Sequence, residues 1–247
     1  MTETPDPKHG ERFRTWMASG TGDPTPAIPA ATVVLLRDTA DGVETLMLRR
    51  NSKIAFGGMW VFPGGRVEEA DGTDDEVAIA RRAAVREAEE ECGLVVGVDD
   101  LVAVSHWTPP PVTPKRFSTW FFVARAPEGA VTIDDGEIRE HMWVAPHEAL
   151  AQRDRAVIEL APPTWVTLHD LGAATHTADA LARARALEPL VYVTQIAKTA
   201  DGLAALWAGD HAYETGEDAD GPGPRHRLVM TETAWRYERT TPEGPAG

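Results

Sequence analysis

Three glutamates spaced for one helical face constrain this chain more than any other feature. Glu87, Glu90 and Glu91 stand at offsets i, i+3 and i+4, so a helix would gather them within about one turn. Like charges at these offsets repel by a few tenths of a kcal/mol per pair. A cation such as Mg²⁺ removes that repulsion, because it binds carboxylates, substrate phosphate and water through oxygen. The spacing therefore predicts a metal-binding helix.

Runs of glutamate are more often solvated helix surfaces than metal sites, so the neighbouring residues matter. Here Arg86 stands directly before the first glutamate, Gly93 follows the last, and a Pro63-Gly64-Gly65 turn lies upstream. The paired glycines permit a sharp turn and a close approach of the backbone. Chance rarely supplies this combination, so we favour the metal site.

Composition and charge exclude several classes of partner. Hydrophobic residues make up 43% of the chain and charged residues 26%, with a formal net charge of −15. The negative field repels phosphate backbones, so we expect neither nucleic acid nor a membrane as partner. The single cysteine, Cys92, cannot pair within the chain, and no apolar run has the length of a signal or a membrane span. These features indicate a cytoplasmic protein in which Cys92 fills the core.

The pattern of the chain predicts three parts. Residues 1–29, rich in proline, form a flexible N-terminal arm; residues 30–158 form a core; residues 159–247 form an extension packed on it. Apolar runs predict strands in the core at 32–36, 44–48, 101–107, 118–124 and 142–144. In the extension we expect a helix from Pro162, a helix over 177–186, and strands at 190–193, 203–207 and 227–235.

The acidic helix itself is predicted over Asp74–Cys92. Thr73 and Glu76 have the spacing of a capping box at its start. Several alanines favour helix in between, and Gly93 suits the left-handed position after the last turn.

Gly65 together with Arg86-Glu87-Ala88-x-Glu90-Glu91-x-Gly93-Leu94 resembles the Nudix box, Gly-x5-Glu-x7-Arg-Glu-U-x-Glu-Glu-x-Gly-U with U aliphatic. The second half matches at every fixed position. The first half departs, because the separation of Gly65 from Arg86 is seven residues longer than in the usual box. The acid that replaces the first Glu of the box stays open among four candidates, Asp71, Glu68, Glu69 and Glu76.

The resemblance implies an α/β (α+β) fold, an α/β/α sandwich around a mixed sheet, here followed by a helix/strand extension. It also implies hydrolysis of a nucleoside diphosphate linked to another group. Glu87, Glu90 and Glu91 would hold Mg²⁺ or Mn²⁺, with the carbonyl of Gly64 as a further ligand. Arg86 would orient a nearby carboxylate and so support catalysis.

The reaction also needs a carboxylate that takes a proton from water. Glu87 is one candidate. Glu137 and Glu140 precede Trp143, where related enzymes often place a base, and of these two we favour Glu137. The alternative is that both are solvated loop acids.

Leu46-Met47-Leu48-Arg49-Arg50 and Gly58-x3-Phe62-Pro63-Gly64-Gly65 resemble the elements that flank the box in the coenzyme A diphosphatase branch of the family. The long box is most similar to that of the peroxisomal-type subgroup of this branch. On this resemblance five residues contact the substrate: Arg49, Arg50, Gly65, Arg116 and Phe117. The second arginine usual in this branch is missing, and Arg49 and Arg50 could instead be ordinary charges at a strand end. Aromatic residues offer a stack for adenine, although core packing is the more common role: Trp60, Trp107, Trp120 and Phe117.

Three functions remain open. The first is a diphosphatase of coenzyme A or acyl-CoA, and the second is the same reaction on ADP-ribose, NADH or a dinucleoside polyphosphate. The third is a noncatalytic nucleotide-sensing domain, which the three intact glutamates argue against. In each case the partner is a small-molecule nucleoside diphosphate derivative, and the oligomeric state stays open with a homodimer as one option.

Overall fold

The computed structural model describes residues 26–51, 58–111, 113, 115–133, 136–231 and 233–240. Residues 1–25 of the predicted arm lie outside these ranges, and its last residues, Ile28 and Pro29, already belong to the first strand. Within the described ranges, no helix has both the length and the apolar character needed to cross a membrane.

A mixed sheet of eight strands forms the centre of the described structure. Its strand order is β3-β2-β1-β6-β5-β8, with β4 paired to β1 and β7 paired to β2. β1 runs parallel to β6 and antiparallel to β2, so the sheet is mixed as predicted. The strands are β1 (Ile28–Thr39), β2 (Gly42–Arg50), β3 (Trp60–Val61), β4 (Gly64–Arg66), β5 (Val102–Thr108), β6 (Phe117–Arg125), β7 (Ile138–Val144) and β8 (Leu190–Val193).

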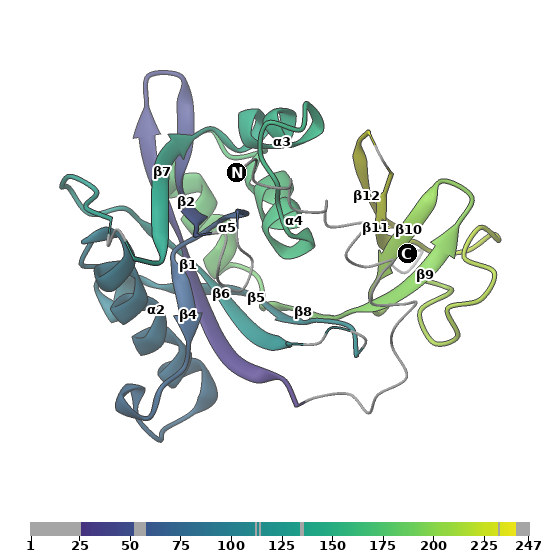
Figure 1. The fold of residues 1–247 in the computed structure, drawn as a ribbon, viewed down its shortest axis with the longest axis horizontal. Helices are drawn as coiled ribbons and strands as arrows, with labels where there is room; N and C mark the ends of the chain where they lie inside the picture. Colours follow the sequence, from purple (N-terminus) through teal and green to yellow (C-terminus); the bar gives the residue numbers. More distant parts are fainter. Residues whose placement is uncertain are drawn as a thin grey trace, which may run out of the picture.

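Helices cover both faces of this sheet, because its strands are apolar on both sides. Along β1, Val33 and Leu35 pack toward one helix while Val34 and Leu36 pack toward three others. The first face carries α2 (Glu76–Cys92), and the second carries α3 (Pro146–Asp154), α4 (Pro162–Leu171) and α5 (Thr177–Arg185). Figure 1 shows these layers, which confirm the predicted α/β/α sandwich.

The C-terminal extension contributes to this sandwich as well as adding to it. Its strand β8 pairs in parallel with β5, and its helix α5 packs on β1, β5 and β6. Beyond β8 a second, antiparallel sheet follows in the order β12-β11-β10-β9. Its strands are β9 (Gln195–Thr199), β10 (Gly202–Leu206), β11 (His226–Met230) and β12 (Trp235–Arg239). The boundary between core and extension at residue 158 stays a prediction.

The predicted single strand at 227–235 is wrong. The chain forms β11 and β12 there, joined by a turn in which the Thr231 hydroxyl donates to the Ala234 carbonyl and accepts from its N–H. Strand β9 was also not predicted. β9, β11 and β12 are short, and pairing with their neighbours in the sheet determines them more than their own sequence does.

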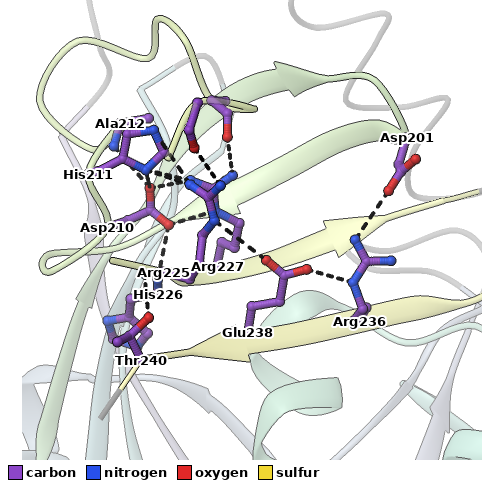
Figure 2. A network of polar contacts seen from close by, with 12 residues as sticks. Asp201, Asp210, His211, Ala212, Arg225, His226, Arg227, Arg236, Glu238 and Thr240 are labelled. Carbon is purple, nitrogen blue, oxygen red and sulfur yellow. Dashed lines mark hydrogen bonds and ion pairs between the residues drawn. The ribbon is translucent and has the colours of Figure 1, made fainter. Parts of the chain in front are cut away.

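A buried ion pair ties the loop between β10 and β11 to the second sheet. Asp210 has a fully buried side chain and accepts from Arg227 Nε at 2.6 Å and Arg227 Nη2 at 2.5 Å. The backbone N–H groups of Ala212 and His226 donate to the same carboxylate at 3.0 and 2.9 Å. Figure 2 shows this network beside the exposed pair Asp201–Arg236. The Asp210 carboxylate thus closes the loop onto the sheet.

Candidate active site

The acidic helix α2 begins and ends close to where the sequence indicates. Its N-cap is Asp75, whose side chain accepts from the backbone N–H of Ala78 at 3.1 Å, so the predicted Thr73 cap is wrong. Gly93 ends the helix at φ 70°, the left-handed conformation expected of it. Between them a row of small residues packs closely against β1 and fixes which side faces the sheet: Ala80, Ala83, Ala84 and Ala88.

Glu91 is the most buried of the three predicted metal ligands. Its side chain is 5% exposed, and its Oε2 accepts from the backbone N–H of Gly64 at 2.9 Å. Burial raises the pKa of Glu91 to about 8, although this hydrogen bond and Arg50 act in the opposite direction. The turn before the helix and the helix itself therefore meet at this carboxylate.

Of the four acids that could replace the first Glu of the box, Asp71 is the one that Arg86 contacts. It lies in a short 3₁₀ turn, η1 (Glu69–Asp71), and is buried. Arg86 Nε and Nη2 donate to its two oxygens, both at 3.1 Å. Burial raises the pKa of Asp71, but the hydrogen bonds from Arg86 and from the Glu68 backbone outweigh it, so the net shift is downward. Asp71 reaches Arg86 from this turn and not from a continuous helix.

Arg86 also holds two of the box glutamates. Its Nη1 donates to Glu87 Oε1 at 2.9 Å and to Glu90 Oε2 at 3.0 Å, while Nη2 donates to the carbonyl of Arg66. Hydrogen bonding to Asp71 is the largest cause that raises the pKa of Arg86. Burial raises the pKa of Glu87 in spite of this pairing. Arg86 thus bonds three acids at once, a geometry compatible with the positioning role that the resemblance implies.

Both glycines of the turn are required by close approach. A Cβ at Gly65 would overlap the carboxylate of Glu87, and a Cβ at Gly64 would lie 2.6 Å from the Cβ of Thr32. A side chain at Gly64 would displace the backbone of β1, whereas one at Gly65 would displace the Glu87 carboxylate from its place against the turn. The role of Gly65 is therefore to let Glu87 lie against the backbone.

The two arginines at the end of β2 face opposite sides. Arg50 pairs with Glu137 at 2.7 Å, and its Nη1 lies 3.8 Å from Glu91 Oε1. Arg49 pairs with Glu140 at 2.7 Å on the other side of the sheet. The structure thus brings Arg50 and Glu137 to the box and leaves Arg49 and Glu140 away from it.

A cavity of about 530 Å³ opens over these residues. Its lining includes the predicted site residues Gly64, Gly65, Arg50, Arg86, Glu87, Glu90, Glu91, Phe117 and Glu137. Arg49, Glu140 and Arg116 are not among the lining residues, and the Arg116 guanidinium donates to the carbonyl of Pro109. The sequence did not indicate that the extension also lines this cavity, through Ala161, Pro162, Pro163, Thr164, Thr194 and Ala205.

Most of the aromatic candidates for an adenine stack are core residues. Trp60 is buried, and Trp107 is stacked on Tyr192 with ring centroids 3.7 Å apart. Trp120 stacks on His106 and donates through Nε1 to Glu76. Phe117 alone of the four is a partly exposed ring in the cavity lining.

Cys92 is core, as expected. Its thiol is buried and donates to the carbonyl of Ala88, and burial raises its pKa to about 11. A thiol with so high a pKa is almost wholly protonated at neutral pH and is a poor nucleophile.

The donor set of the box suits a hard divalent cation. Glu91 Oε1 is buried and makes no hydrogen bond, which leaves a carboxylate oxygen available to a cation. Glu87 and Glu90 on the same helix and the carbonyl of Gly64 supply further oxygens, the ligand type that Mg²⁺ binds.

Arg86 competes with a cation for two of these ligands. In the part of the chain that the structure describes, no three His, Cys, Asp or Glu side chains form a ready metal-ligand cluster. Arg86 Nη1 bonds both Glu87 and Glu90 in this arrangement. Cation binding by all three glutamates therefore requires these two carboxylates to turn toward Glu91.

Comparison with known proteins identifies the class to which this fold and site belong. A model of the NUDIX domain matches residues 26–164, more than half of the chain. The chain therefore belongs to the Nudix family and is a hydrolase of that class. No curated protein matches its sequence.

One solved structure shares the fold at low sequence identity, and two others give lower scores. A NUDIX hydrolase from Alicyclobacillus acidocaldarius superposes with a TM-score of 0.59 at 22% identity, over 64% of this chain and 96% of that one. The NUDIX domain of Shewanella oneidensis NrtR, complexed with ADP ribose, gives 0.48 at 16% identity, over 68% and 97%. A C. elegans Ap4A hydrolase gives 0.42 at 21% identity, over 64% and 98%.

Replacing Asp71 tests its assignment as the displaced acid of the box. We expect Asp71→Asn to lower turnover by roughly 10- to 100-fold, because Arg86 would lose the partner that fixes it against Glu87 and Glu90. Since the effect passes through the ligands, the concentration of cation that gives half-maximal activity should rise as well. The matched control is Glu69→Gln in the same turn, where the side chain is exposed. Equal losses in both variants, or none in Asp71→Asn, would exclude this role.

Proposed function

We propose that this Nudix hydrolase is a divalent-cation-dependent diphosphatase, with coenzyme A or acyl-CoA as its substrate class. One observation carries the proposal: a single cavity joins the box acids and Arg50 to a wall of apolar and aromatic residues. The box acids and Arg50 suit a diphosphate, and the apolar and aromatic wall suits a large group attached to that diphosphate. The coenzyme A assignment rests in addition on the sequence motifs beside the box.

Mg²⁺ or Mn²⁺ is the cofactor that we assign to Glu87, Glu90, Glu91 and the carbonyl of Gly64. When bound, such a cation neutralises phosphate oxygens and lowers the pKa of water. Groups of the protein itself hold these ligands in position. Gly64 N–H and the helix backbone hold Glu91 in place, and Arg86 restrains Glu87 and Glu90 on the cavity side of α2.

Arg50 and Glu137 have complementary roles in this proposal. Arg50 lies in the cavity lining, 16% exposed, with its guanidinium between Glu91 and Glu137, where it can bind a phosphate oxygen. A phosphate that engages Arg50 competes with Glu137 for it. Glu137 then becomes available as the base that takes the proton of the attacking water. Glu140 pairs with Arg49 outside the cavity lining, so we propose Glu137 for this role.

Two alternatives keep the same site. In the first, the substrate is ADP-ribose, NADH or a dinucleoside polyphosphate; in the second, the domain binds a nucleotide without cleaving it. Glu91 Oε1 disfavours the second, because a buried carboxylate oxygen that accepts no hydrogen bond is costly unless a ligand uses it.

A substrate panel separates these functions. The full-length protein is incubated with CoA, acyl-CoAs, NADH, ADP-ribose and diadenosine polyphosphates, with Mg²⁺ or Mn²⁺, and the products are separated by chromatography. We expect 3′,5′-ADP from CoA substrates, loss of turnover with EDTA, and recovery when either cation is restored. Turnover of only the other diphosphates would reject the coenzyme A assignment. Tight nucleotide binding without turnover would favour the sensor.

A further inference from the structure

The extension builds one end of the candidate active-site cavity from uncharged residues. The lining of the cavity extends from α2 and β4 to α4 and β10; in Figure 1, α2 lies at the left and β10 at the right, with β4 and α4 between them. All six residues that the extension contributes to the lining are uncharged: Ala161, Pro162, Pro163, Thr164, Thr194 and Ala205. The charged residues of the lining, which are its carboxylates, its arginines and Lys115, come from segments outside the extension. The two ends therefore differ in chemistry.

The N-terminus of α4 lacks the groups that usually bind anions. A helix normally presents about four backbone N–H groups at its start, and these attract phosphate. In α4 the first two helical positions are Pro162 and Pro163, neither of which has an N–H. No side chain caps this helix. The end of α4 thus offers prolyl rings to the cavity where phosphate-binding donors would otherwise stand.

Several other groups at this end contact one another. The Thr194 hydroxyl accepts from Trp207 Nε1 at 3.1 Å. Trp107 stacks on Tyr192, and Phe121 meets Phe62 edge-on with centroids 6.3 Å apart. Trp107 and Phe121 therefore offer a buried wall and not an open ring face on which a base could stack.

We infer that the extension forms an apolar specificity subsite, centred on the N-terminus of α4, that binds an aliphatic group attached to the diphosphate. The inference rests on the proposed function for the position of the diphosphate and goes beyond it in naming what recognises the other half of the substrate. A ribose or second nucleotide would place hydroxyls or charge against Pro162, Pro163 and Ala205 without hydrogen-bond partners. Such mismatches typically reduce binding about 10-fold or more.

Pro163 is the position at which to test the subsite. It is partly exposed and is the second residue of α4, where glutamate is favourable because it lies at the positive end of the helix. Pro163→Glu should therefore fold while placing a charge in the apolar end. Pro163→Leu changes the side chain at the same position but keeps it apolar. His147→Glu is the matched control, because it puts the same charge at the second position of α3, is exposed, and lies outside the cavity lining.

Two substrates that share ADP distinguish the ends of the cavity: ADP esterified with an octyl chain on its terminal phosphate, and ADP-ribose. We expect the wild type to favour octyl-ADP by about 10-fold or more in kcat/KM. Pro163→Glu should abolish this preference, chiefly through the KM of octyl-ADP, whereas Pro163→Leu and His147→Glu should keep it. Equal kcat/KM values in the wild type, a preference that survives Pro163→Glu, or one that His147→Glu also removes would each overturn the subsite.

Binding separates this inference from the proposed function. The affinities of octyl-ADP and ADP for the same four proteins are measured by calorimetry in the presence of Ca²⁺. If no diphosphate is hydrolysed but octyl-ADP still binds more tightly than ADP, and only Pro163→Glu removes the difference, the proposed reaction fails and the subsite stands. Turnover of diphosphates with no gain in affinity from the octyl chain would leave the reaction intact and reject the subsite.

Discussion

Glu91→Gln is expected to lower turnover by at least about 100-fold while the protein keeps its fold. The substitution removes the charge of the most buried box acid, whose Oε1 makes no hydrogen bond. Its amide oxygen can still accept from the N–H of Gly64, so the contact between the turn and α2 survives. What is lost is a charged ligand for the cation, and with it the neutralisation of the phosphate.

The control for Glu91→Gln lies on the same helix. Glu89→Gln removes an equal charge from an exposed side chain outside the cavity lining and should leave kcat within about 2-fold. Mn²⁺ binding followed by electron paramagnetic resonance should weaken in Glu91→Gln alone. A fully active Glu91→Gln protein would show that the metal assignment is wrong.

The same substitution has a pH-dependent effect on stability. Burial raises the pKa of Glu91 to about 8 from an ordinary value of 4.5. The stability associated with the protonated carboxyl is therefore fully present below about pH 4.5 and is lost as the pH rises toward 8. Without added divalent cation, Glu91→Gln should gain stability relative to the wild type over this interval. Urea denaturation at pH 5 and pH 8.5 measures the change, and a constant difference would contradict it.

Asp210→Ala should destabilise the protein by about 3–5 kcal/mol. The side chain of Arg227 is 3% exposed, and the substitution would leave its charge buried without the carboxylate that it bonds twice. The N–H groups of Ala212 and His226 would lose their acceptor as well. Urea denaturation at neutral pH gives the free energy of unfolding, and the β10–β11 loop should become the first segment to exchange its amide hydrogens.

The control for Asp210→Ala is the exposed pair shown beside it in Figure 2. Asp201 is 58% exposed and pairs with Arg236, so Asp201→Ala should cost less than about 1 kcal/mol.

The destabilisation caused by Asp210→Ala should become smaller at acid pH. Burial raises the pKa of Asp210, but Arg227 and two backbone N–H groups lower it by more, so its contribution is present above about pH 4 and is lost at lower pH. A loss below 1 kcal/mol for Asp210→Ala would refute the stabilising role of the pair.

Local spacing allowed the centre of the site to be predicted. The offsets of the three glutamates, the alanines between them and Gly93 specify one helix, and the structure forms α2 with these features. Apolar runs predicted most strands of the central sheet for the same reason, because burial on both faces makes such runs continuous.

The choice among candidates in the loops depended on long-range contacts. Four acids could have replaced the first Glu of the box, and Asp71 is the one held by Arg86, fifteen residues away along the chain. Glu137 and Glu140 are also nearly equivalent in sequence. The irregular register of β2 and β7 between Arg49 and Arg50 pairs each arginine with a different acid and turns only one pair toward the box. A shift of one residue reverses the face, and the sequence pattern does not reveal it.

The sequence by itself determined the reaction class and the helix and turn on which the candidate residues stand, because a helix and a glycine turn are specified by residues close to one another. The tertiary structure decided which acid supports Arg86, which arginine reaches the cavity, and that the extension completes it. The cavity brings together segments more than a hundred residues apart, such as Gly64 and Ala205, and its assembly depends on sheet register and on the packing of α4. Only the folded chain brings such segments together.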